Sequence, residues 1–197
     1  MCIRDRHQLV PKEVAALRGT PVAAVSAGYL HSLALTVGGD VFSWGRAEGA
    51  LEGDEECFED GVLGHGDAAP QLGPKKVEAL SGTFVAAVSA GYGHSLAVTV
   101  DGAMLSWGKA TGVNIHEEVV VNGGLGHGDD VDQLVPRRIE ALDGVEAVHV
   151  AAGYQCSFVV DAGGTVHAFG KNGRGDLGLG DCDDRVLPTA MEALTLA

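Results

Sequence analysis

A twenty-residue stretch returns three times along the chain at a nearly fixed period. The copies are Ser26 to Gly45, Ser89 to Gly108 and, more loosely, Ala151 to Gly170. The first two are identical at 14 of 20 positions, and their glycines Gly28 and Gly91 lie 63 residues apart. A fixed period of this kind is typical of repeat architectures, in which each unit buries its apolar surface against its neighbours. We therefore expect similar units stacked side by side.

Each copy predicts the same local structure. In the first copy, Val22 to Val25, His31 to Thr36 and Val41 to Trp44 have the composition of short strands, and Gly38-Gly39-Asp40 is typical of a hairpin turn. The copies show no helical periodicity. A strand meander buries its faces by stacking on equivalent sheets, which favours propeller blades over a solenoid.

Two further markers follow the repeated stretch in a constant order. The first is an LGxGD motif, which gives the repeated positions Gly64 and Asp67, Gly126 and Asp129, and Gly178 and Asp181. The second has the form Gln-Leu-x-Pro and ends in Glu-Ala-Leu, beginning at Gln71 and at Gln133. A related version begins at Gln8, so we expect the chain to open with the tail of a unit.

Three markers recur in the same order in three copies: GYxHSLALT, VFSWG, and LGHGD with a following proline. By these markers the chain resembles the regulator of chromosome condensation repeat family. The resemblance runs from about Gln8 to Leu194. It implies an all-β fold, a partial β-propeller of about three blades plus the end of a fourth, each a meander of short antiparallel strands. We expect an unstructured chain start at 1–6, the tail of an incomplete repeat at 7–20, and repeats at 21–82, 83–144 and 145–197.

Histidines hold repeated slots and raise the question of a metal site. His31 and His94 share one slot, and His65 and His127 share another. Equivalent residues of different units lie in different blades, whereas zinc needs three or four ligands at about 2.0–2.3 Å. We therefore expect imidazoles that bridge backbone groups in a turn and so satisfy buried polar atoms, with no metal and no cofactor. Cys156 holds the first slot in the third copy, which a small buried residue can fill.

The other repeated positions are interpreted as structural. The aspartates of LGxGD readily accept hydrogen bonds from nearby backbone N–H groups in turns. The remaining positions are turn glycines and core aromatics: Gly28, Gly91, Gly153, Trp44 and Trp107.

The composition bounds the function. The sequence has no GxSxG and no HExxH, and the glycines of LGxGD lack the helix that a phosphate cradle needs, so we expect no enzyme. The net charge of −14 disfavours direct binding to DNA or RNA. The sequence contains no apolar run of roughly eighteen residues, the length that would indicate a membrane-spanning segment. The four cysteines form no CxxC pair, which predicts a reducing compartment, the cytoplasm or the nucleus.

Two long inserts precede the LGxGD motif. Residues 46–62 and 109–124 number 17 and 16, against 6 for residues 171–176. Equivalent inserts in a repeat array fall on one face, often the binding face. The acidic first insert is either a solvated loop or a docking site for a basic partner, and the second is apolar enough for a strand pair or a docking surface. The candidate partner-binding residues are Glu48, Glu52, Asp54, Glu55, Glu56, Glu59, Asp60, Ile115, Glu117 and Glu118.

The resemblance implies recognition of a protein partner through one propeller face, in company with the remaining blades of a larger propeller. The alternative within the family is guanine-nucleotide exchange on a Ran-like small GTPase, which makes no covalent bond. An enzyme housed on a propeller is a third class, which the lack of convergent acids or histidines disfavours. Exchange is confined to a few family members, so recognition of a protein, either a small GTPase or a basic protein, ranks first.

Overall fold

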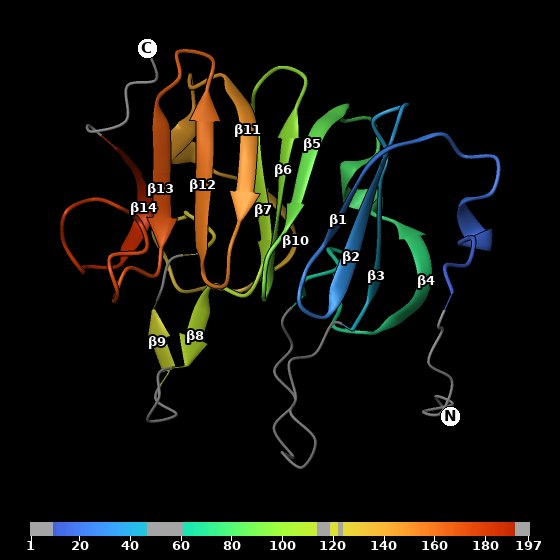
Figure 1. Ribbon diagram of the computed structural model, residues 1–197, viewed down its shortest axis with the longest axis horizontal. Coiled ribbons are helices and arrows are strands. Elements are labelled where there is room, and N and C mark those ends of the chain that lie inside the picture. The colour runs from blue at the N-terminus through green and yellow to red at the C-terminus, as the bar shows by residue number, and fades with distance from the viewer. Residues whose placement is uncertain (1–9, 47–60, 114–118, 122–123, 192–197) are drawn as a thin grey trace.

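The chain forms three four-stranded antiparallel sheets that stand side by side as the blades of a partial propeller (Figure 1). The computed structural model describes residues 10–46, 61–113, 119–121 and 124–191. This arrangement confirms the all-β prediction. The blades consist, in turn, of β1 (Val22–Ala27), β2 (His31–Thr36), β3 (Val41–Gly45) and β4 (Gln71–Lys76); β5 (Val85–Ala90), β6 (His94–Thr99), β7 (Met104–Gly108) and β10 (Gln133–Arg138); and β11 (Ala147–Ala152), β12 (Cys156–Asp161), β13 (Val166–Gly170) and β14 (Arg185–Ala190).

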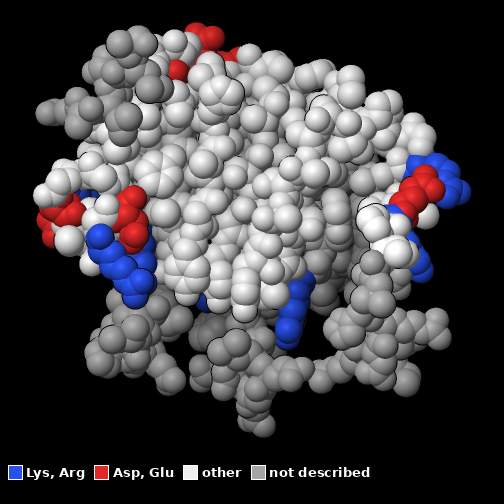
Figure 2. All heavy atoms as spheres, in the orientation of Figure 1, with Lys and Arg blue, Asp and Glu red and all other residues white. Residues whose placement is uncertain are grey.

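The first three strands of each blade lie where the repeated stretch predicts them. β2 pairs with both β1 and β3, and the turn between β2 and β3 contains Gly39 with a φ of 81°, a backbone angle that glycine adopts without strain. The first strands β1, β5 and β11 face the viewer in Figure 1. Figure 2, in the same view, shows a broad uncharged surface over them.

The fourth, outer strand of each blade comes from the proline-containing marker, which the sequence did not identify as a strand. β4 pairs with β3 at Gly45↔Gln71 and at Ser43↔Lys75. The register shifts between these two pairs, because β4 has more residues between them than β3, and Pro74 is one of these residues. Proline lacks a backbone N–H and is tolerated at sheet edges and bulges. An outer strand with an irregular register meets that condition.

The hydrophobic core lies between blades. One cluster joins Leu33, Leu35 and Val41 of the first blade to Val85 and Trp107 of the second. An equivalent cluster joins the second blade to the third. Short 3-10 helices follow the outer strands and contribute a buried leucine to each cluster; they are Glu78–Leu80 and Glu140–Leu142, and a third, Ala15–Leu17, precedes β1. The blades are therefore stabilised by mutual stacking.

The second insert contains a strand pair, as one of its two interpretations predicts. β8 (Thr111–Val113) and β9 (Val119–Val121) are antiparallel and project from the lower edge of the blades in Figure 1. No helix in the described part of the chain is long and apolar enough to cross a membrane.

Candidate partner-binding face

Neighbouring blades approach each other closely at the repeated glycines. A Cβ on Gly28 would lie 2.4 Å from the carbonyl oxygen of Gly91, and a Cβ on Gly91 would lie 2.7 Å from that of Gly153. Real side chains do not tolerate such distances from backbone atoms. The missing side chains let Tyr29 donate a backbone hydrogen bond to Gly91 at 3.2 Å, and Tyr92 donate one to Gly153 at 3.0 Å.

These backbone bonds align three tyrosines in a row across the blades. The rings of Tyr29 and Tyr92 are stacked, with centroids 4.4 Å apart and planes 21° apart. The rings of Tyr92 and Tyr154 are tilted by 47° with centroids 4.3 Å apart. Tyr29 and Tyr154 are 55% and 56% exposed. We call the edge formed by Tyr29, Tyr92 and Tyr154 the tyrosine face.

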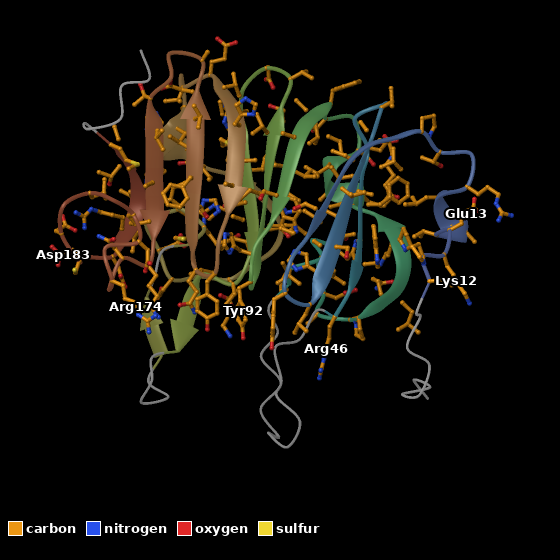
Figure 3. All side chains as sticks on the ribbon, viewed as in Figure 1. Lys12, Glu13, Arg46, Tyr92, Arg174 and Asp183 are labelled. Atoms are coloured by element: carbon orange, nitrogen blue, oxygen red, sulfur yellow. The ribbon has the colours of Figure 1, made fainter. Side chains whose placement is uncertain are left out.

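The tyrosine face carries a basic residue from each blade. Arg46, Lys109 and Lys171 each follow the last residue of a third strand. Figure 3 shows Tyr92 and Arg46 at the same edge of the blades. The Lys171 Nζ lies 6.0 Å from the Tyr154 ring centroid, within reach of a cation–π interaction. The arrangement combines aromatic rings with cations, a composition suited to recognition.

The first histidine slot joins one blade to the next behind this face. His31 Nε2 lies 2.8 Å from the Ser95 Oγ, and His94 Nε2 lies 2.9 Å from the Ser157 Oγ. The imidazole thus contacts a hydroxyl of the following blade, whereas the sequence suggested backbone groups of a turn. Burial lowers the pKa of His31 to about 4, and burial together with the nearby His31 lowers the pKa of His94 to about 4.

The second histidine slot lies within one blade. His65 Nε2 lies 3.0 Å from the Ser43 Oγ, and His127 Nε2 lies 2.9 Å from the Ser106 Oγ. Burial lowers the pKa of His65, and burial with the Arg137 charge lowers that of His127 to about 4. Among the described residues, no group of three or more histidine, cysteine or acidic side chains is placed to hold a metal ion.

The remaining repeated positions maintain the blades. Trp107 is fully buried and donates from Nε1 to the Val62 carbonyl at 2.9 Å, while Trp44 is half-buried. The aspartates of LGxGD each accept a backbone N–H two residues later, with distances of 3.1 Å for Asp67, 3.3 Å for Asp129 and 3.0 Å for Asp181. The glycines Gly64, Gly126 and Gly178 have positive φ, and a Cβ on each would contact the side chains of Trp107, Phe169 and Met191.

The predicted partner-binding residues of both inserts, Glu48 to Asp60 and Ile115 to Glu118, lie outside the described residues. The tyrosine face is not among the sites predicted from the sequence. A signal for it exists, because a tyrosine follows each repeated glycine and a basic residue follows each repeated strand at β3, β7 and β13. The sequence cannot show that these two sets share one edge, which depends on blade packing.

Comparison with known proteins supports the repeat assignment. Models described as "Regulator of chromosome condensation (RCC1) repeat" match residues 22–48, 57–98, 121–160 and 163–195. The match at 57–98 contains β4, β5 and most of β6, so this repeat runs from the outer strand of one blade into the next blade.

Several named proteins are similar over most of the chain. The ultraviolet-B receptor UVR8 of Arabidopsis thaliana is 34% identical over 94% of the chain and 37% of the receptor. The human E3 ubiquitin-protein ligase HERC2 is 38% identical over 87% of the chain but only 3% of the ligase. The Saccharomyces cerevisiae Prp20p structure, described with its binding to Gsp1p and histones, superposes with a TM-score of 0.65 at 24% identity over 87% of the chain and 38% of Prp20p. The chain thus spans well under half of each relative.

Proposed function

Because the chain belongs to the regulator of chromosome condensation repeat family, we propose that it is a protein-recognition module that binds its partner through the tyrosine face. The observation that carries this proposal is the row of three tyrosine rings in contact, of which Tyr29 and Tyr154 are more than half exposed. Tyrosine and arginine are enriched at the energetically important positions of protein interfaces.

The tyrosine face is also organised before any partner arrives. Tyr29 and Tyr92 are held by backbone hydrogen bonds to the next blade, and their rings stack on each other. A partner therefore orders few side chains on binding, which lowers the entropic cost of association. The β8–β9 hairpin projects from the same edge in Figure 1, so the surface available to a partner extends beyond the rings.

We propose no catalytic role for this segment. Its repeated histidines have lowered pKa values and are hydrogen-bonded to serines behind the face. HERC2 is named as a ligase, but the chain corresponds to 3% of it. One relative, RUG3 of Arabidopsis thaliana, is named as mitochondrial, so the cytoplasm or nucleus is a proposal that rests on the cysteine pattern.

Guanine-nucleotide exchange is the second candidate, favoured by the fold shared with Prp20p, whose structure is described with its binding to Gsp1p. Identity of 24% supports the fold alone, so exchange ranks below recognition. The test is the release of a fluorescent guanine nucleotide from a Ran-like GTPase. We expect the chain to leave the release rate unchanged, and acceleration would place exchange first.

Recognition is tested by selecting a peptide library displayed on phage with the full chain as bait. We expect enriched peptides that bind the chain and fail to bind the variant Tyr29→Ala/Tyr154→Ala. The variant Tyr29→Phe/Tyr154→Phe keeps both rings and serves as the matched control, which should retain most of the binding. If the enriched peptides bind the alanine variant equally well, or none is enriched, the tyrosine face is not the recognition surface.

A further inference from the structure

The position of the basic residues on the tyrosine face is fixed by the backbone. The amide N–H of Arg46 donates to Leu30 at 2.8 Å, that of Lys109 to Gly93 at 2.7 Å, and that of Lys171 to Gln155 at 2.9 Å. Each acceptor is the residue after a tyrosine of the row. Every blade therefore holds one cation beside one tyrosine by the same hydrogen bond.

The preceding glycines make this contact possible. Gly45, Gly108 and Gly170 have φ values of 122°, 105° and 106°, a region that side chains disfavour. A Cβ on Gly45 would lie 2.4 Å from the Leu30 carbonyl oxygen, and the other two glycines are equally confined. The strand end thus turns sharply at each glycine and presents the next residue at the edge.

The basic character of the edge differs from blade to blade. In the second and third blades, Asp132 and Asp184 accept the backbone N–H of Ala110 and Asn172, the residues that follow Lys109 and Lys171, both at 2.7 Å. The first blade has Pro70 in this slot, one residue before the strand β4. Arg46 therefore has no carboxylate from this slot beside it, whereas Lys109 and Lys171 each precede a residue whose backbone N–H is bonded to one.

We propose that the tyrosine face binds an acidic peptide segment of its partner, with carboxylates or phosphorylated side chains at the cations and an apolar side chain on the rings. This inference rests on the proposed function and specifies the chemistry of its partner. Each blade places one cation at this edge, beside a tyrosine of the row. Opposite charge at a binding surface speeds association and excludes partners of the wrong sign.

The length of the row favours a short peptide over a nucleic acid. The two ring-to-ring intervals of 4.4 and 4.3 Å together match about three residues of an extended chain. A short peptide can end within this row. A longer polyanion would extend over the rest of a chain that carries 27 acidic against 13 basic residues, and repulsion would oppose it.

The test is fluorescence anisotropy of a labelled peptide that alternates Glu with Leu, titrated with the full chain. The comparison probes are the same peptide with Lys in place of Glu, a phosphoserine version, and a single-stranded oligothymidine. We expect binding of the Glu and phosphoserine probes and none of the Lys probe. The ratio of the two anionic affinities distinguishes carboxylate from phosphate as the preferred group.

Charge reversals locate the binding. We expect the double variant Arg46→Glu/Lys171→Glu to bind the Glu probe with roughly tenfold lower affinity. Arg46→Glu alone should account for the larger share of this loss. Lys12→Glu is the matched control, since Lys12 is exposed and lies away from this edge, beside Glu13, in Figure 3. It should change the affinity by less than about twofold, and circular dichroism should show all variants folded.

Three outcomes would overturn the inference: equal or tighter binding of the Lys probe, an equal loss for Lys12→Glu, or tighter binding of oligothymidine than of the Glu probe. Failure here is separable from failure of the proposed function. If phage-selected peptides depend on Tyr29 and Tyr154 but carry no acidic residues, the face recognises proteins and only the acidic chemistry is wrong.

Discussion

The imidazole Nε2 of His31 lies 2.8 Å from the Oγ of Ser95 in the neighbouring blade. The Ser95 Oγ in turn donates to the Val62 carbonyl at 2.9 Å. A hydroxyl has one hydrogen, so His31 must be the donor in the first bond, with its proton on Nε2. His94, Ser157 and Gly124 repeat this order at the next junction. Each junction therefore requires a proton on Nε2, and the lowered pKa of both histidines favours the neutral form, in which Nδ1 carries no proton.

Replacing His31 with Ala should lower the free energy of unfolding by about 1–3 kcal/mol, because it leaves the buried Ser95 hydroxyl without its donor. Urea denaturation measures this. Ser95→Ala should cost a similar amount, and the double variant should cost less than the sum, since both changes break the same bond. Additive costs would show that the two residues act independently.

Acid should destabilise the chain in a window set by these histidines. The pKa of His31 and of His94 in the folded state is about 4, below the unfolded value of 6.5, so the unfolded state binds protons first as the pH falls. The contribution of these histidines to the free energy of unfolding is fully present above pH 6.5. As the pH falls to 4, this free energy decreases by about 3 kcal/mol per histidine. Urea midpoints across this range measure the loss.

The variant His31→Gln/His94→Gln is the control for that pH dependence. Its amide N–H can donate to the serine hydroxyls but does not titrate. We expect its stability to vary less between pH 6.5 and 4 than that of the original chain. The pH dependence that remains should include contributions from His65 and His127, whose pKa values are also lowered. A pH dependence identical to that of the original chain would assign acid sensitivity to other groups.

Much of the fold follows from local sequence. Strand composition, glycine turns and the fixed period predict β1, β2, β3 and their stacked copies, because each signal lies within one unit. The outer strand β4 escaped prediction because its proline and charged residues are atypical of strands. An irregular outer edge tolerates them, and that edge exists only once the blade has formed.

The tyrosine face was less predictable than the fold. His31 and Ser95 are 64 positions apart, and the sequence shows their repetition but not their contact. Likewise, Tyr29 and Arg46 belong to different strand ends that meet only through the hydrogen bond between Arg46 and Leu30. Such contacts depend on blade spacing and register, which no local pattern encodes.

Gly91→Ala should destabilise the junction that aligns the tyrosines. The new Cβ would lie 2.7 Å from the Gly153 carbonyl oxygen, and two blades would have to separate to admit it. We expect the free energy of unfolding to fall by about 3 kcal/mol, as measured by urea denaturation. Gly73→Ala is the matched control, because a Cβ on Gly73 has no atom within 4 Å, and its cost should stay within about 0.5 kcal/mol. Equal costs would contradict the role of close blade approach.

Neutralising the acidic insert should distinguish the two kinds of partner. Replacing its seven acids with Gln or Asn removes seven negative charges from a segment that begins beside Arg46 and keeps its length. If the tyrosine face binds acidic peptides, the Glu probe should bind more tightly, because repulsion near Arg46 is removed. The hypothesis of a basic partner docked on the insert predicts instead that binding of a basic probe is lost.

The salt dependence separates this electrostatic effect from a change in structure. Salt screens interactions between charges in solution, so the difference in affinity between the original and neutralised chains should shrink from low salt to about 0.3 M salt. An unchanged urea midpoint would show that the blades are intact. If the neutralised chain binds the Glu probe more weakly at every salt concentration, the acids assist recognition, and the tyrosine face does not select an acidic partner.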